Sequence, residues 1–66
     1  MGERIRLLRE TRGLSRYALA YLIHCEPISI MLWEDGNTTP TLRMICRLAD
    51  FFKVDTDYII NGGGDE

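Results

Sequence analysis

Residues 14–42 read LSRYALAYLIHCEPISIMLWEDGNTTPTL, and this stretch predicts two short helices joined by a tight turn. Ser15 is a favourable N-cap for a helix over residues 16–23, because its hydroxyl can accept a hydrogen bond from a free backbone N–H. Pro27 suits the first position of the next helix, where its missing N–H costs no hydrogen bond, and Gly36 stops that helix. The apolar side chains that we expect to face the core recur at helical spacing: Leu19, Ala20, Ile23, Ile30 and Trp33.

Three further helices are predicted around this pair. We expect them over residues 3–12, 42–52 and 55–60, where Thr41 and Asp55 are the caps of the last two. The inward side chains of the helix over 42–52 are expected to be Leu42, Ile45, Leu48, Ala49 and Phe52. The sequence therefore predicts an all-α, five-helix bundle that forms one domain over residues 1–62, followed by a flexible tail at 63–66.

Composition narrows the class of function. The 66 residues suffice for one small domain, and the two cysteines, Cys25 and Cys46, form no CxxC pair. One histidine completes no zinc ligand set, so we expect free thiols, no metal and no cofactor. No run approaches the roughly 18 apolar residues of a membrane span, which favours a cytoplasmic location. No acid is paired with a base or a nucleophile, so we do not expect an enzyme.

The charge distribution counts against tight, autonomous DNA binding. The net charge is -2 with a pI near 5.3, whereas nucleic-acid domains often have a pI above about 9. Between Arg16 and Arg43 the chain has no lysine or arginine at all. The two helices of the predicted pair therefore offer few cations to a polyanion.

The spacing nevertheless resembles a known family. The patterns are Leu14-Ser15-x-x-x-Leu19-Ala20-x-x-Ile23 and Ile30-x-x-Trp33-Glu34-x-Gly36-x-x-x-Pro40-x-Leu42. Both are similar to the lambda-repressor/Cro type of helix-turn-helix, and the resemblance covers about residues 2–62. It implies a compact five-helix bundle without a cofactor, which binds operator DNA as a dimer with the third helix in the major groove.

The resemblance also implies which residues would touch DNA. Arg12, Arg16 and Arg43 would hold phosphates, which positions the protein without reading sequence. The positions that would face bases are Pro27, Ile28, Ser29 and Leu32, of which only Ser29 has a hydrogen-bonding side chain. An apolar side chain can contact a thymine methyl, but it cannot read guanine or adenine by paired hydrogen bonds.

Two positions depart from the family pattern in their backbone requirement. His24 stands in the turn where the family usually has glycine, and Lys53 replaces a usual glycine after the fourth helix. A non-glycine residue with a positive φ is strained, by on the order of 1 kcal/mol.

An apolar face is the second unusual feature of the predicted helix pair. Tyr17 and Tyr21 are spaced i, i+4 on one helix, and Ile28, Met31 and Leu32 form a stripe on the next. The predicted protein-binding residues are Tyr17, Ala18, Tyr21, Leu22, His24, Ile28, Met31 and Leu32. The alternative is a purely structural role, in which Leu22 and Met31 lie partly in the core and His24 is a solvated turn residue.

Two functions therefore stay open. The composition favours a protein-binding module, natural or engineered, on a repressor-type scaffold, whose partner is another protein or a second copy of the chain. The alternative is a sequence-specific, DNA-binding transcriptional repressor that uses the arginines and base-facing residues named above. Salt dependence separates the two, because phosphate contacts release counterions and make binding weaken steeply with salt.

Overall fold

Five α-helices build the chain in the computed structural model, which describes residues 1–62. They are α1 (Gly2–Thr11), α2 (Arg16–Ile23), α3 (Pro27–Asp35), α4 (Leu42–Phe52) and α5 (Thr56–Asn61). No strand occurs within these residues. The bounds confirm the predicted α2, α3 and α4, and they move α1 and α5 by one residue each. The predicted tail at 63–66 lies outside the described residues.

Local hydrogen bonds explain where α2 and α4 begin. The Ser15 Oγ accepts a hydrogen bond from the backbone N–H of Ala18 at 3.0 Å, and Thr41 Oγ1 accepts one from Met44 at 3.2 Å. Each bond satisfies one of the N–H groups that the first helical turn leaves free. Asp55 precedes α5 as predicted, but its side chain forms no capping hydrogen bond.

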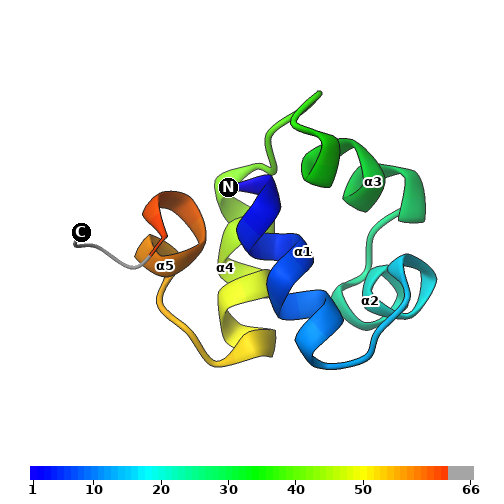
Figure 1. Cartoon of the computed structure of the whole chain (residues 1–66), viewed down its shortest axis with the longest axis horizontal. Helices are drawn as coiled ribbons and strands as arrows, with labels where there is room; N and C mark the ends of the chain where they lie inside the picture. The colour runs from blue at the N-terminus through cyan, green and yellow to red at the C-terminus, as the bar shows by residue number, and fades with distance from the viewer. Residues whose placement is uncertain (63–66) are drawn as a thin grey trace.

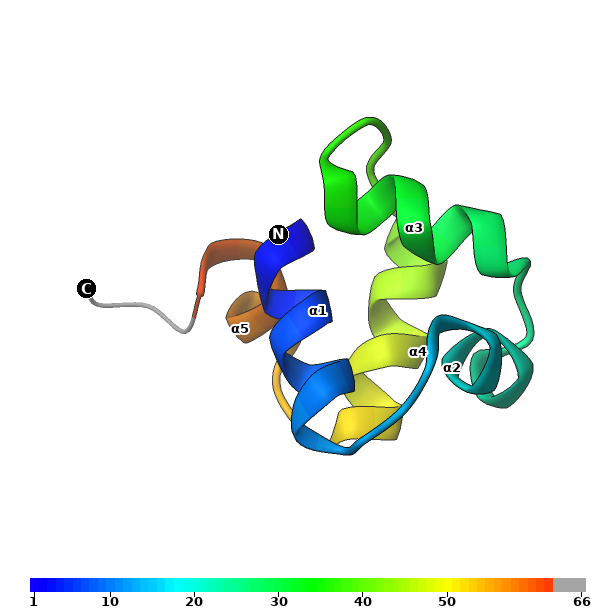
Figure 2. The same cartoon turned by 45° about the vertical axis from the view of Figure 1, so that its right-hand side comes forward.

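Every helix contributes one of the five largest fully buried side chains of the core. These residues are Ile5, Leu19, Ile30, Leu48 and Ile59. The two helices of the predicted pair, α2 and α3, pack on each other, and α1 packs on α3. Figures 1 and 2 show α5 and the α2–α3 pair at opposite ends of the molecule, with α1 and α4 between them. The α2–α3 pair therefore packs against α1 and α4 on one side, and its other side faces solvent.

One predicted core residue is wrong. Leu42 is 68% exposed, although its spacing places it on the apolar face of α4. It is the first residue of that helix, and a helical side chain leans toward the N-terminus. Its side chain therefore extends beyond the end of the helix instead of against a neighbour.

The predicted backbone strain is confirmed at both positions. His24 has φ 64° and Lys53 has φ 60°, so both residues lie in the left-handed region, at the C-termini of α2 and α4. The αL conformation lets each helix end in a turn that a glycine would adopt without a Cβ penalty.

No helix within residues 1–62 has the length and apolar character that crossing a membrane requires.

Candidate nucleic-acid interface

The exposed line of α3 is apolar and centred on one side chain. Ile30 and Trp33 face the core, and Ile28 points to the opposite side with 53% of its surface exposed. Met31 and Leu32 flank Ile28 and are half-buried. The prediction of an outward apolar residue is confirmed for Ile28, whereas Leu32 is only partly accessible.

The predicted apolar face is divided among separate hollows. One hollow between α2 and α3 is lined by Arg16, Tyr17, Pro27, Ile28 and Met31. Tyr21 and Ser29 line a different hollow, which also reaches the loop before α4 at Thr39. Ala18 is half-buried. The eight residues therefore do not share one depression.

Leu22 and His24 lie where two hollows meet: they line the hollow of Tyr21 and Ser29, and they also border α4. Both line a third hollow that includes Arg47 and Phe51 of α4. The turn itself is held by Arg47, whose Nη1 donates a hydrogen bond to the Ile23 carbonyl at 3.1 Å.

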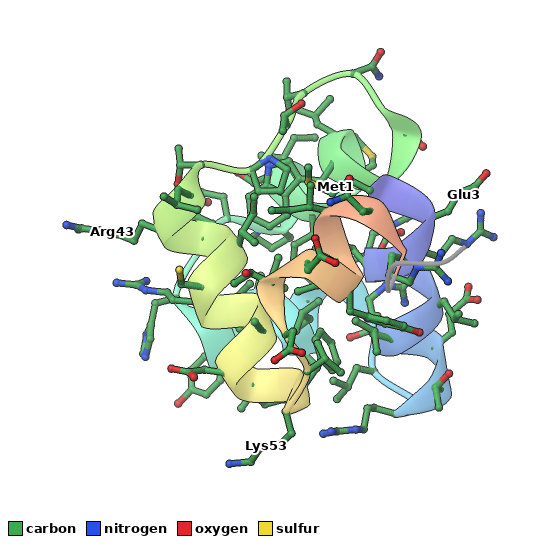
Figure 3. The ribbon with its side chains drawn as sticks, turned by 90° about the vertical axis from the view of Figure 1, so that its left-hand side faces the viewer. Met1, Glu3, Arg43 and Lys53 are labelled. Atoms are coloured by element: carbon green, nitrogen blue, oxygen red, sulfur yellow. The ribbon has the colours of Figure 1, made fainter. Side chains whose placement is uncertain are left out.

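The three predicted phosphate-binding arginines lie in different surroundings. Arg16 lies beside Ile28 in the hollow between α2 and α3. Arg43 is exposed and projects from α4 away from the bundle (Figure 3). Arg12 follows α1, donates a hydrogen bond to the Phe52 carbonyl at 3.3 Å, and lies over the rings of Phe51 and Phe52.

Arg12 therefore belongs to the C-terminal end of α4, which Figures 1 and 2 place away from α3. The structure does not bring it to the exposed face of the helix-turn-helix. Its three contacts explain the difference, since they hold the exposed guanidinium against two aromatic rings and a carbonyl at the C-terminus of α4.

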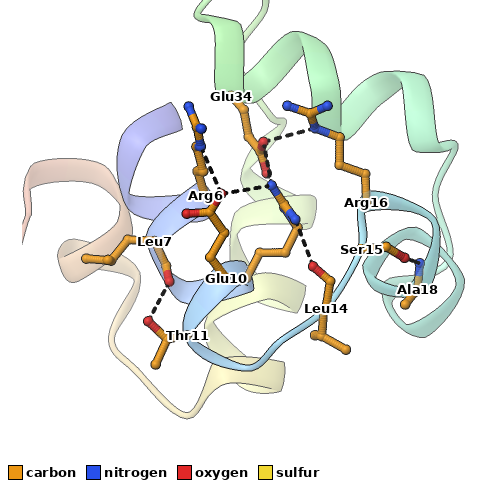
Figure 4. A network of polar contacts seen from close by, with 10 residues as sticks. Arg6, Leu7, Glu10, Thr11, Leu14, Ser15, Arg16, Ala18 and Glu34 are labelled. Atoms are coloured by element: carbon orange, nitrogen blue, oxygen red, sulfur yellow. Dashed lines mark hydrogen bonds and ion pairs between the residues drawn. The ribbon is translucent and has the colours of Figure 1, made fainter.

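A buried ion-pair network supports the interface from behind. Glu34, near the end of α3, has a side chain only 1% exposed and binds two arginines (Figure 4). Arg9 Nε donates to its Oε2 at 2.7 Å, and Arg9 Nη2 donates to its Oε1 at 3.2 Å. Arg16 Nε donates to the same Oε1 at 3.1 Å. Glu34 thus joins α1 and the start of α2 to α3.

Arg9 completes the network and was missed by sequence reasoning. Its Nη1 donates to the Leu14 carbonyl at 2.7 Å, and the hydrogen bond to Glu34 raises the pKa of its guanidinium further, against the opposing effect of burial. A signal was present in the sequence, because Arg9 lies four residues after Ile5 and so shares the inward face of α1.

The cysteines and the acidic residues offer no separate site. Within residues 1–62 no group of three His, Cys, Asp or Glu side chains is placed to hold a metal ion. Cys46 is exposed, and Cys25 is half-buried in the turn. Burial raises the pKa of the Cys25 thiol, and the nearby Glu26 adds to this increase.

Comparison with known proteins identifies the class. The family model described as "Helix-turn-helix domain" matches residues 1–58, and the chain belongs to this family. The fold is that of a phage-repressor domain: it is similar to the P22 c2 repressor protein, solved in complex with synthetic operator 9T in the presence of Tl+. The TM-score is 0.87 at 28% sequence identity, over 92% of each chain. No curated protein matches the chain.

These comparisons favour the operator-binding alternative over the protein-binding prediction. They define a repressor-type helix-turn-helix domain, and they give no support to an engineered protein-binding module.

Proposed function

We propose that this chain is the DNA-binding domain of a transcriptional repressor and that it places α3 in the major groove. The observation that carries the proposal is the repressor fold, shared over 92% of the chain with a protein solved on its operator, together with the exposure of Ile28 on the outer line of α3.

Base contact through this face is mainly apolar. Ile28 is the most exposed apolar side chain of α3, and half-buried Leu32 and Met31 stand beside it. An isoleucine in the major groove meets the C5-methyl group of thymine, the one apolar feature of a base edge there. Ser29 adds one hydroxyl that can donate or accept.

The phosphate contacts fall to Arg16 and Arg43. Arg16 flanks α3 at the start of α2, and Arg43 extends from the start of α4. The candidate interface should repel DNA less than the net charge of the chain suggests. Glu34 is enclosed and compensated by Arg9 and Arg16, so its charge does not face the DNA. Few phosphate contacts then imply a modest affinity that depends on salt.

The first test is a titration of fluorescent duplex DNA at increasing salt. We use a random-sequence pool of about 20 base pairs, long enough for two half-sites one helical turn apart. The expected result is binding at about 50 mM salt that weakens as salt rises, with a slope set by the small number of phosphate contacts, because each contact releases counterions. Absence of any binding at that salt, or binding that salt leaves unchanged, would reject the proposal.

The second test asks whether Ile28 reads bases. Ile28→Asp should abolish preference for duplexes selected by the wild-type chain, because a carboxylate meets the groove in place of a methyl-binding surface. Leu7→Asp is the matched control: Leu7 is 49% exposed, and Figure 4 shows it on the side of α1 away from Arg16. Replacing thymine with uracil in the selected duplex should weaken the wild-type complex by about tenfold, as expected for one lost base contact. Equal losses for both variants would contradict the assignment to Ile28.

A further inference from the structure

Arg16 has one edge fixed inside the protein and the other edge free. Its Nε is bonded to Glu34 Oε1 at 3.1 Å, and its side chain remains 39% exposed. Within residues 1–62, no hydrogen bond joins either of its Nη atoms to the protein. Figure 4 shows both Nη atoms extending past Nε at the outer end of the side chain.

The partner of that fixed edge is itself held by other residues. Glu34 is enclosed, and Arg9 holds both of its carboxylate oxygens at 2.7 and 3.2 Å. Arg9 is anchored in turn by the Leu14 carbonyl. A carboxylate held by one arginine therefore presents its remaining acceptor direction to a second arginine at the protein surface.

We propose that Glu34 is a positioning residue for DNA binding: it fixes Arg16 through Nε so that the Nη atoms grip a backbone phosphate. This inference rests on the proposed function. Arg16 lines the same hollow as Pro27 and Ile28, so its free end lies beside the first turn of α3, where a strand of the major groove would pass. Fixing the side chain in advance removes much of the rotamer entropy that a flexible arginine loses on binding.

Arginine and lysine differ sharply in this arrangement. Lysine has a methylene where arginine has Nε, and its single ammonium replaces the whole guanidinium. An ammonium that binds Glu34 no longer extends to a phosphate, and one that extends to a phosphate gives up Glu34. The proposal therefore requires the fork of arginine at position 16, whereas a simple phosphate contact requires only the charge.

The experiment compares this arginine with one that has no carboxylate partner among the described residues. Arg16→Lys, Arg16→Gln, Arg43→Lys and Arg43→Gln are titrated against the random-sequence duplex pool at several salt concentrations. We expect Arg16→Lys to weaken binding about tenfold, nearly as much as Arg16→Gln, and both to reduce the salt slope by about 0.9. Arg43→Lys should stay within about twofold of the wild type, because an exposed phosphate contact needs the charge alone.

A phosphate-specific measurement excludes a merely structural effect. Ethylation of single phosphates in a selected duplex should reveal one position that interferes with the wild-type chain but no longer with Arg16→Lys. Thermal denaturation of each variant shows whether the fold is kept. If Arg16→Lys loses its fold, interference changes at every phosphate. If it loses only the Arg16 contact, interference disappears at one phosphate.

Two results would overturn the inference while leaving the proposed function in place. One is that Arg16→Lys binds with wild-type affinity while Arg16→Gln is weakened, which would show that a positive charge alone is sufficient for the phosphate contact. The other is an unchanged interference pattern. If the wild-type chain itself binds no duplex, the proposed function fails first, and the positioning role of Glu34 fails with it.

Discussion

His24 shows how one residue can hold the turn of the helix-turn-helix in a strained state. Its φ of 64° and ψ of 55° lie in the left-handed region, where a Cβ atom crowds the following carbonyl. The turn needs this conformation to end α2 and start α3 within a few residues. The packing of α2 on α3 therefore offsets the backbone strain at His24.

Replacing His24 with glycine should stabilise the domain. His24→Gly removes the Cβ strain, and part of the gain is lost because glycine has more freedom in the unfolded chain, which leaves about 0.5–1 kcal/mol. The free energy of unfolding, from urea titration, measures it. His24→Ala keeps the Cβ atom and should show no such gain. A His24→Gly variant no more stable than His24→Ala would contradict the strain argument.

Gly2 is required for a steric reason, because no space is left for a side chain between α1 and the end of α3. A Cβ built on Gly2 would fall on the carbonyl oxygen of Trp33 and come within 3.0 Å of the Glu34 carbonyl. We expect Gly2→Ala to cost about 1–3 kcal/mol of stability, because α1 must move away from the end of α3. The neighbouring Glu3→Ala, at an exposed position, should change stability by less than about 0.5 kcal/mol. Equal effects in thermal denaturation would show that α1 shifts freely.

At the scale of elements, the contact between α1 and α3 combines close backbones with a buried ion pair. Gly2 lets the start of α1 approach the end of α3, and Arg9 reaches Glu34 from the last turn of α1. Because Glu34 also binds Arg16, the same carboxylate sets the position of the α2 N-terminus. One enclosed carboxylate therefore links α3 to both α1 and the start of α2.

Breaking this pair from one side should cost more than removing it whole. Glu34→Leu leaves Arg9 without its carboxylate and should cost about 3–5 kcal/mol, as for other buried pairs. The double variant with Arg9→Met should be less destabilised than the sum of the two single variants by about 1–3 kcal/mol. Urea denaturation of the four proteins measures this coupling.

The exposed pair Arg6–Glu10 is the control for that cycle. Its atoms are 3.2 Å apart, but both side chains are more than half exposed. An exposed i, i+4 pair contributes about 0.3–0.5 kcal/mol, so its coupling should be far smaller. Additive effects at Arg9 and Glu34, like those at the exposed pair, would mean that the network does not join α1 to α3.

At the scale of the whole molecule, the proposed function requires a small acidic domain to bind a polyanion with few cations. The net charge is -2, and several basic residues already bind other parts of the fold: buried Arg9 binds Glu34, and the exposed Arg12 and Arg47 bind carbonyls at the ends of α4 and α2. One copy of the domain then offers few phosphate contacts. Two copies on neighbouring half-sites double them without a new surface.

The stoichiometry on DNA should reflect this. We expect sedimentation to show two chains on a duplex selected from the random pool, with half-sites about one helical turn apart, and single chains in the absence of DNA at low concentration. A duplex cut to one half-site should bind one chain and lose most of the affinity. Saturation of the full duplex by a single chain would contradict the two-fold arrangement.

The sequence by itself determined the helices and their order. Ser15 and Thr41 cap α2 and α4, Pro27 begins α3, and Gly36 ends it, because capping and backbone geometry depend on neighbours a few residues away. The core positions of α2 and α3 followed from the helical period for the same reason. The family pattern added the way in which the five helices assemble.

Only the tertiary structure decided which side chains are available at the interface. It enclosed Glu34 with Arg9 and Arg16, took Arg12 to the far end of α4, exposed Leu42, and divided the predicted apolar face among three hollows. The partners in these contacts are about 18 to 40 residues apart in the chain. Helical periodicity gives the direction of a side chain around its own axis, whereas burial and ion pairing depend on which other helix lies opposite.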